Sequence, residues 1–213
     1  MGMAIDRPAA RAVGAALPGL ALAAAGLAHP HSLNATSAER WTQLHLVGLF
    51  VFPLVALALV WLVRGRTDLV AWVVRLTAYV YATAYSALDV ISGIGAGYVT
   101  WRLAEGVPRP DEVRFLFSIG GRIGEMGSWA LLACTVVVVL DAARRLGAAA
   151  VPGVMMVPGA WLVHADHIFS PYGALGMLLV GLGTGALAWR APADGVSPQA
   201  RPRRSATRGP GRR

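Results

Sequence analysis

Residues 41–63 read WTQLHLVGLFVFPLVALALVWLV, and this stretch decides the fold class. It contains no Asp, Glu, Lys or Arg, and its polar residues lie close to its start. A helix needs about 20 predominantly apolar residues to cross the hydrocarbon core of a bilayer. The stretch therefore predicts a membrane-spanning helix, with Trp41 and Trp61 near its ends, where interfacial aromatic residues gather.

The composition of the whole chain agrees with this interpretation. Of its 213 residues, 56% are hydrophobic and 14% are charged, whereas about a quarter of a typical soluble domain is charged. Every basic residue is arginine, which is typical of a GC-rich bacterial genome. Cys134 is the single cysteine, so a disulfide within the chain and cysteine-based zinc or iron–sulfur sites are excluded.

Six apolar segments have a length suited to crossing a membrane. They are residues 10–28, 41–63, 69–101, 113–140, 148–169 and 172–189. We expect an all-α integral membrane bundle of about six transmembrane helices over residues 1–190. The first segment also fits a signal peptide cleaved after Ala28, which would leave five helices. Residues 191–213 are rich in Arg and Pro and predict a disordered tail.

The distribution of arginine predicts the orientation. With the N-terminus inside, the inner side holds fourteen arginines and four aspartates, and the outer side holds four arginines and four acidic residues. This positive-inside asymmetry indicates a bacterial cytoplasmic (inner) membrane with both termini cytoplasmic. We expect the lipid bilayer as a partner, with anionic inner-leaflet lipid binding the tail. No nucleic-acid partner is expected, and a homo-oligomer remains open.

The charged residues Asp89, Arg122 and Glu125 lie well inside the apolar segments. Asp89 falls on one face of residues 69–101, with Arg75, Tyr79 and Ser86 at helical spacing, so it should point into the bundle. Arg122 precedes Glu125 by three residues, and the two could form an ion pair on the helix surface. These acids, with Arg122, could orient metal ligands or relay protons, or they could form a purely structural network.

Histidine gives the sharper pattern, because the predicted topology places all five on the outer half. His164 and His167 lie three apart in LVHADHIFSPYG, so on a continuous helix both project from one face. Imidazole is a good ligand for copper, iron and zinc. We therefore expect a transition-metal or haem site at the extracytoplasmic mouth, with copper or haem as candidate cofactors. Its candidate ligands are His29, His31, His45, His164 and His167.

Other functions stay open at this point. A small proton-coupled transporter would use Asp89, Arg122 and Glu125 as its relay. A non-catalytic membrane scaffold would use the same polar residues only for assembly. The sequence has no phosphate-binding loop, dinucleotide fingerprint, HExxH motif or GxSxG elbow, and its loops are short. Any chemistry must therefore use the bundle and its outer mouth, and the sequence assigns no catalytic residue and no enzymatic activity.

With WTQLHLVGLFVFPL, YSALDVISGIGAGY and HIFSPYGALGML in view, the chain resembles small uncharacterised multipass membrane proteins of GC-rich bacteria. The resemblance spans most of residues 29–189. It implies a helical membrane bundle and carries no mechanism.

Overall fold

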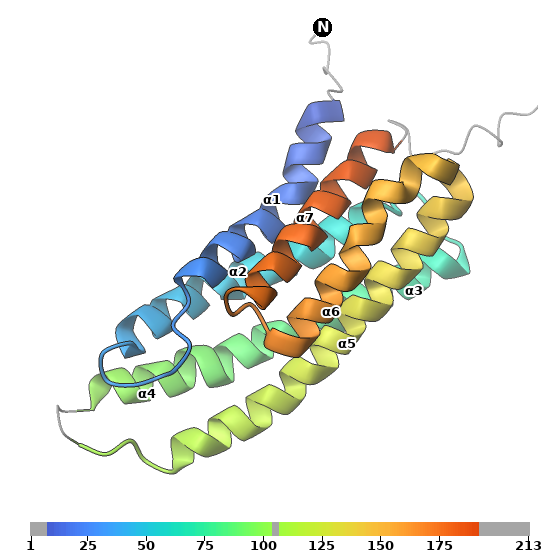
Figure 1. Ribbon diagram of the computed structural model, residues 1–213. Coiled ribbons are helices and arrows are strands. Elements are labelled where there is room, and N and C mark those ends of the chain that lie inside the picture. Colours follow the sequence, from blue (N-terminus) through green and yellow to red (C-terminus); the bar gives the residue numbers. More distant parts are fainter. Residues whose placement is uncertain (1–7, 104–106, 192–213) are drawn as a thin grey trace, which may run out of the picture.

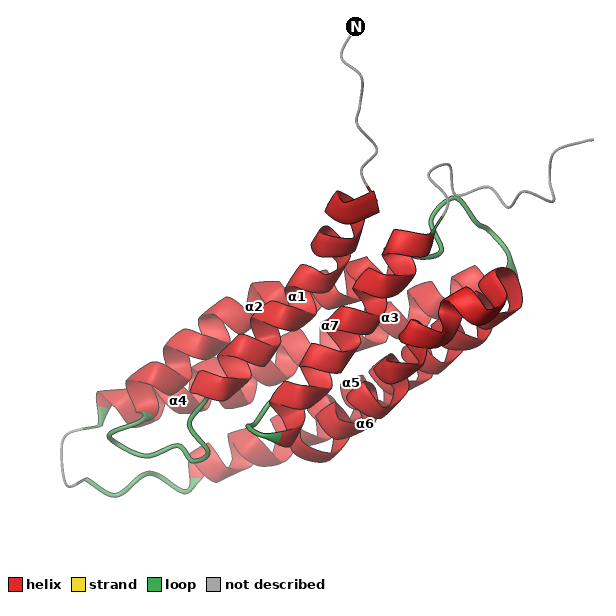
Figure 2. Ribbon diagram, turned by 45° about the horizontal axis from the view of Figure 1, so that its top comes forward, coloured by secondary structure: helices red, strands yellow, loops and turns green. Residues whose placement is uncertain are grey.

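The computed structural model describes residues 8–103 and 107–191, and this part of the chain is helical throughout with no strand. Short loops join the helices (Figure 2). In chain order the elements are α1 (Pro8–Ala28), α2 (Ala38–Trp61), α3 (Leu69–Leu88), the π-helix η1 (Asp89–Gly95), α4 (Ala96–Arg102), α5 (Glu112–Leu146), the 3-10 helix η2 (Gly147–Met155), α6 (Met156–Asp166) and α7 (Tyr172–Arg190). The tail predicted over residues 191–213 lies outside the described residues, apart from Ala191.

Within residues 8–103 and 107–191, four helical segments are long and apolar enough to cross a membrane: Pro8–Ala28, Ala38–Trp61, Glu112–Asp166 and Tyr172–Arg190. The predicted helical, membrane-type fold is thereby confirmed, while the count of about six crossings stays a prediction. The third segment contains a reversal at Gly147, whose φ of 57° favours glycine, and α6 returns against α5. This segment therefore supplies two neighbouring helices, α5 and α6 (Figure 1).

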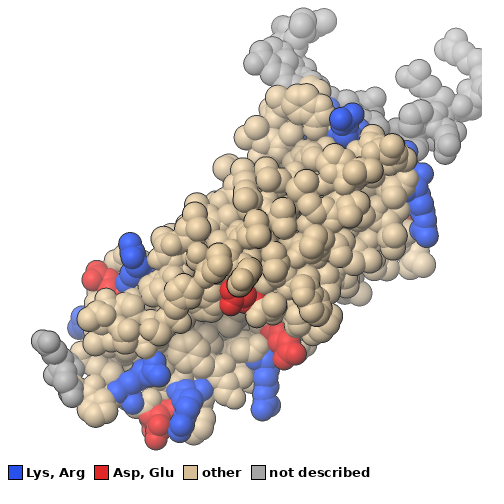
Figure 3. Space-filling view, in the orientation of Figure 1, with Lys and Arg blue, Asp and Glu red and all other residues tan. Residues whose placement is uncertain are grey.

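The helices pack so that apolar side chains also remain on the outer surface of the bundle. Helix α1 lies along α7, α3 lies along α5, and α2 packs against α3 and η1 (Figure 1). Phe50, Leu57 and Leu76 are each more than 60% exposed. Charged side chains gather mainly toward the two ends of the molecule, and the length between them is largely uncharged (Figure 3). An apolar outer belt of this kind is what a bilayer would cover.

The buried face of residues 69–101 differs from the predicted one. Asp89 is buried as expected, but Tyr79, which was predicted to share its face, is 67% exposed. The buried positions of α3 are instead those of Val74, Ala78, Tyr81 and Tyr85. Asp89 follows Tyr85 by four residues and Ala78 by eleven, so it lies on their face of the helix, and the π-helix changes the register only for the residues after Asp89. It places Ser92 and Gly93, adjacent in sequence, in the interior together.

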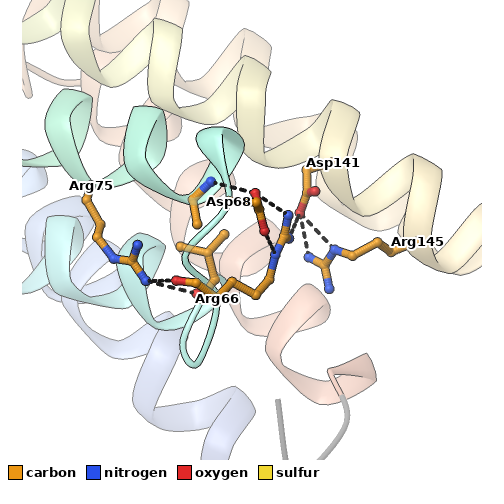
Figure 4. Close-up of polar contacts among 7 residues, drawn as sticks. Arg66, Asp68, Arg75, Asp141 and Arg145 are labelled. Atoms are coloured by element: carbon orange, nitrogen blue, oxygen red, sulfur yellow. Dashed lines mark hydrogen bonds and ion pairs between the residues drawn. The ribbon is translucent and has the colours of Figure 1, made fainter. Parts of the chain in front are cut away.

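Arginine–aspartate contacts connect the helix ends at the predicted inner side (Figure 4). Arg66 donates hydrogen bonds to Asp141 on α5 at 2.6 Å and to Asp68 at 2.8 Å, and Arg145 donates to Asp141 at 2.8 Å. Asp68 also caps α3 by accepting from the Ala71 amide. The Arg66 guanidinium and that amide lower the pKa of Asp68 to about 2. These contacts fix the end of the bundle opposite the histidines.

Candidate functional site

Two histidines face each other at the opposite end of the bundle. His29 directly follows α1 and is 4% exposed, and His45 lies two turns into α2 and is 6% exposed. Their Nε2 atoms are 3.5 Å apart. The Nδ1 atom of His29 lies 2.7 Å from the Pro30 carbonyl, and that of His45 lies 2.7 Å from the Trp41 carbonyl.

These carbonyl contacts assign the tautomers. A carbonyl oxygen only accepts, so each Nδ1 must carry the proton and donate it. Burial also lowers the pKa of His29, which favours its neutral form. Each Nε2 is then left with a lone pair, and the two Nε2 atoms are close enough to share one ion. A backbone carbonyl that orients the far nitrogen in this way is the usual support of a metal-bound histidine.

Asp89 completes the cluster from η1. It is 0% exposed, its Oδ1 lies 4.0 Å from His45 Nε2, and neither carboxyl oxygen has a hydrogen-bond partner. Its Oδ2 lies against Gly48 of α2, where an added Cβ would be only 2.7 Å away. A buried carboxylate without a partner is costly, so the position favours a bound cation or a proton. The sequence-based expectation that Asp89 points inward is confirmed.

His167 joins the cluster, but His164 does not. Helix α6 ends at Asp166, and His167 adopts a φ of 51°, a left-handed conformation that turns its side chain away from that of His164. The His167 ring stacks on Tyr85 at 5.5 Å and lies 6.4 Å from the His29 ring, centroid to centroid. The expectation that both histidines share one helix face is wrong, because the helix ends between them.

The two remaining histidines lie apart from this cluster. His164 contacts Ser128 of α5, with 2.9 Å between Nδ1 and Oγ, and its ring packs on Trp129 at 4.2 Å. His31 is exposed and stacks on Phe169 at 5.9 Å. Of the five predicted ligands, the structure thus brings together His29, His45 and His167.

Aromatic side chains and glycines shape the cluster. Trp41 lies 4.7 Å from the His29 ring and 5.1 Å from the His45 ring, and its indole N–H donates to the Ser92 carbonyl of η1. Gly93 lies directly beneath the His45 imidazole, so any Cβ there would overlap the ring. Sequence reasoning missed the roles of Gly93 and Trp41. The sequence pattern places Trp41 at a membrane interface and indicates no role for Gly93.

Two cavities meet at His45. A small one of about 110 Å³ is lined by His29, His45, Gly48 and Asp89, among others. A larger, open recess of about 350 Å³ lies beside it, lined by His45 and His167 and by polar residues of α5 and α6. His45 therefore separates the buried carboxylate from a space that opens to the surroundings.

The predicted relay of Asp89, Arg122 and Glu125 is not assembled. Arg122 and Glu125 are both exposed. Among residues 8–103 and 107–191, neither of them forms an ion pair with the other or with Asp89. Glu125 lines the open recess instead. The ionisable side chain given in contact with Asp89 is that of His45, at 4.0 Å.

The spacing of the cluster can be compared with metal geometry. Tetrahedral zinc with metal–nitrogen bonds of about 2.1 Å separates two ligand nitrogens by roughly 3.4 Å, close to the 3.5 Å between His29 and His45. Among the described residues no three His, Cys, Asp or Glu side chains stand close enough to hold an ion as they are. The carboxylate of Asp89 would have to approach His45 by about 0.6 Å, a small side-chain rotation.

The same spacing argues against haem between these two rings. A porphyrin held by two axial histidines must occupy the plane between them, and here Trp41 and Phe169 already pack beside His29 at 4.7 Å. His45 with His164 or His167 is the other pair of histidines that could hold haem, and of these His164 contacts Ser128 of α5. The donor set fits a single small ion better than a macrocycle.

Comparison with known proteins gives no relative from which a function could be carried over: no family model, no curated protein and no solved structure matches this chain.

Proposed function

We propose that this chain is a multi-pass membrane protein that binds one divalent transition-metal ion between His29, His45 and Asp89. One observation carries the proposal: two imidazole Nε2 atoms lie 3.5 Å apart, beside a fully buried carboxylate that has no hydrogen-bond partner among the described residues. Two lone pairs and an anion repel one another, and a cation among them turns each repulsion into an attraction.

The donor atoms indicate the class of metal. Two imidazole nitrogens and one carboxylate oxygen suit zinc, iron(II) or copper(II), whereas magnesium and calcium prefer oxygen donors alone. His167 is half-buried and lies 6.4 Å from His29, centroid to centroid. It is the neighbouring imidazole that could supply a further donor if its side chain rotated. We take zinc as the reference ion because it accepts four-coordinate sites with no geometric preference of its own.

The same proposal includes the membrane setting. In this proposal the chain crosses a bacterial cytoplasmic membrane about six times and has both termini in the cytoplasm. The histidine cluster then lies at the extracytoplasmic end of the bundle. Support comes from the arginine distribution and from the apolar outer surface. It takes residues 8–28 as a retained helix, because Gly19 and Gly181 bring α1 and α7 into close backbone contact. Lipid is then the main partner.

The test is metal binding by the full chain, purified in detergent and stripped with a chelator. Zinc titration followed by elemental analysis should give one ion per chain. Cobalt(II) should give visible absorption bands of a nitrogen- and oxygen-ligated tetrahedral ion. His45→Ala should abolish both signals, since it removes the ligand closest to both partners.

His31→Ala is the matched control, because His31 is exposed and lies on the same loop as His29. It should bind zinc as the wild type does. One ion per chain retained in His45→Ala would contradict the proposed site. Loss of binding in both variants would mean that His31 or its loop is also required, which the proposed ligand set does not predict.

Proton transfer is the second candidate function, and one observation favours it. His45 lines both the cavity that holds Asp89 and the open recess, so it could pass a proton between them. This relay would use Asp89 and His45 without Arg122. In vesicles that contain the metal-free protein, an inward proton gradient should then acidify the vesicle interior. The Asp89→Asn substitution should stop this proton flux.

A further inference from the structure

The open recess beside His45 has the size and lining of a small-molecule site. Its volume of about 350 Å³ falls within the roughly 300–1,000 Å³ that ligand pockets usually have. Aromatic rings from three elements line it: the Trp41 ring of α2 lies 5.9 Å from that of Phe117 on α5 and 6.2 Å from that of Phe169 before α7, centroid to centroid. An aromatic lining of this kind favours a ligand with a flat ring, because aromatic rings pack well on one another.

Tyr85 and His167 add unpaired polar groups to this lining. Tyr85 of α3 is 1% exposed, and its ring stacks on that of His167 at 5.5 Å, with 23° between the two planes. In the described part of the chain, neither the Tyr85 hydroxyl nor the ring nitrogens of His167 have a hydrogen-bond partner. The hydroxyl of the neighbouring Tyr81 is enclosed in the core, whereas that of Tyr85 is not, so the recess is its open side. A ligand at this wall would supply the hydrogen bonds that both groups lack.

The other donors of the recess are already in use. The Trp41 indole N–H donates to the Ser92 carbonyl at 3.2 Å, and the Ser92 hydroxyl donates to a carbonyl of α5 at 3.0 Å. The Ser128 hydroxyl donates to the Glu125 carbonyl at 2.8 Å. What α5 and α6 offer a ligand is therefore acceptors, among them the carboxylates of Glu125 and Asp166, and no arginine lines the recess.

His164 contributes one more acceptor to the lining. Because the Ser128 hydroxyl gives its one proton to the Glu125 carbonyl, it accepts at its 2.9 Å contact with His164 Nδ1. The Nδ1 atom of His164 therefore carries the proton, and its Nε2 atom keeps a lone pair. Ser128 is 3% exposed, so the surrounding structure holds this imidazole in place. A ligand that donates a hydrogen bond toward α5 and α6 fits these acceptors.

A hydroquinone meets both requirements of the recess. It is a flat, uncharged ring with hydroxyl groups at opposite ends, and each hydroxyl both donates and accepts. We infer that the open recess binds the ring of a hydroquinone, with one hydroxyl at Tyr85 and His167 and the other directed to the acceptors of α5 and α6. This site goes beyond the proposed function and does not require the metal ion. Two sources offer such a ring: an isoprenoid quinol of the bilayer and a soluble phenol.

The experiment is a calorimetric titration of the chelator-stripped full chain, in detergent and without oxygen, with trimethylhydroquinone. One molecule should bind per chain. The dimethyl ether of the same compound keeps the ring but has no O–H donor, so it should bind about tenfold more weakly for each hydrogen bond lost. Equal affinities for the two compounds, or the absence of saturable binding, would overturn the inference.

Tyr85→Phe tests the contact at the Tyr85 hydroxyl, and Tyr81→Phe is its matched control. Both substitutions remove one hydroxyl from a buried ring, and the two rings lie 4.9 Å apart, but Tyr81 does not line the recess. Tyr85→Phe should bind trimethylhydroquinone about tenfold more weakly than the wild type, whereas Tyr81→Phe should bind it equally well. Equal affinities of the two variants would contradict the site. Zinc titration of both variants should still give one ion per chain, so failure of this site and failure of the metal centre are separate results.

Vesicles distinguish the two sources of the ring. A hydroquinone with an isoprenoid chain, incorporated in the bilayer, should displace bound trimethylhydroquinone if the natural ligand is a quinol of the membrane. Without such displacement, a soluble phenol is the source. Both results support the ring site, since each requires that trimethylhydroquinone first binds in a saturable way.

Discussion

Replacing Asp89 with Asn should change stability in opposite directions with and without metal. Asp89 is 0% exposed and neither oxygen has a hydrogen-bond partner. An unsatisfied buried polar group costs about 1–3 kcal/mol, and more when it is charged. Asn has the same shape and no charge. Without metal, and at a pH where the Asp89 carboxyl is charged, Asp89→Asn should therefore be more stable than the wild type, with a rise of roughly 2–4 °C in Tm for each kcal/mol.

Metal should reverse this order. At a free zinc concentration of about 100 times Kd, binding stabilises the native state by roughly 2.7 kcal/mol. The wild type should gain that amount. The variant lacks the carboxylate ligand and should gain little. The two melting curves should therefore exchange places on addition of zinc, which no purely structural role of Asp89 would produce.

Cys134 provides the assay. It is the only cysteine and is 0% exposed, so a thiol-reactive fluorescent dye reports unfolding in detergent. Scans would be run with chelator and with zinc. Asp111→Asn is the control, since Asp111 is exposed and its ion pair with Arg114 lies on the surface; it should shift stability by less than about 0.5 kcal/mol. Metal-free Asp89→Asn that melts below the wild type would refute the reasoning.

Two further predictions concern a glycine and an inner-side carboxylate. Gly93→Ala places a Cβ in the His45 ring and should weaken zinc binding on the order of 10–100-fold, measured by calorimetric titration. The control is Gly121→Ala, whose Cβ meets nothing within 4 Å, and this variant should bind zinc as the wild type does. Equal zinc affinities of the two variants would contradict the packing argument. The pKa of Asp68 lies near 2 against an ordinary value of 3.8, so its contribution is complete above about pH 4 and disappears as the pH falls through 2. Circular dichroism melts between about pH 4 and pH 2 should show the wild type losing less than about 1 kcal/mol of unfolding free energy relative to Asp68→Asn, because the carboxylate of the Arg66–Asp68 ion pair is exposed. A stability difference between the two proteins that stays constant with pH would argue against the ion pair.

Part of the candidate site could be predicted from the sequence. Placing every histidine on the outer half made it reasonable to expect His29, His45 and His167 near one another, and an acid inside an apolar segment was expected to face the interior. The expected partnership of His164 with His167 failed because it assumed that the helix continued past Asp166. The expected ion pairing by Arg122 failed because periodicity gives a face of a helix and not the neighbour that this face meets.

The sequence alone determined the class of the protein. Long uncharged segments can bury their backbone polar groups in a bilayer only as helices, so residues 41–63 and their counterparts dictate a helical membrane-type chain. Arginine distribution then predicts a side for each loop. Both conclusions follow from properties that add along the chain, and they need no knowledge of packing.

Only the tertiary structure decided which polar groups meet. The π-helix that starts at Asp89, the left-handed turn at His167 and the close approach of Gly93 to His45 each depend on contacts between segments far apart in the chain. Together these features place three imidazoles and a carboxylate in one cluster. Such a position is defined by ångström-scale distances between helices, and no pattern along a single helix encodes them.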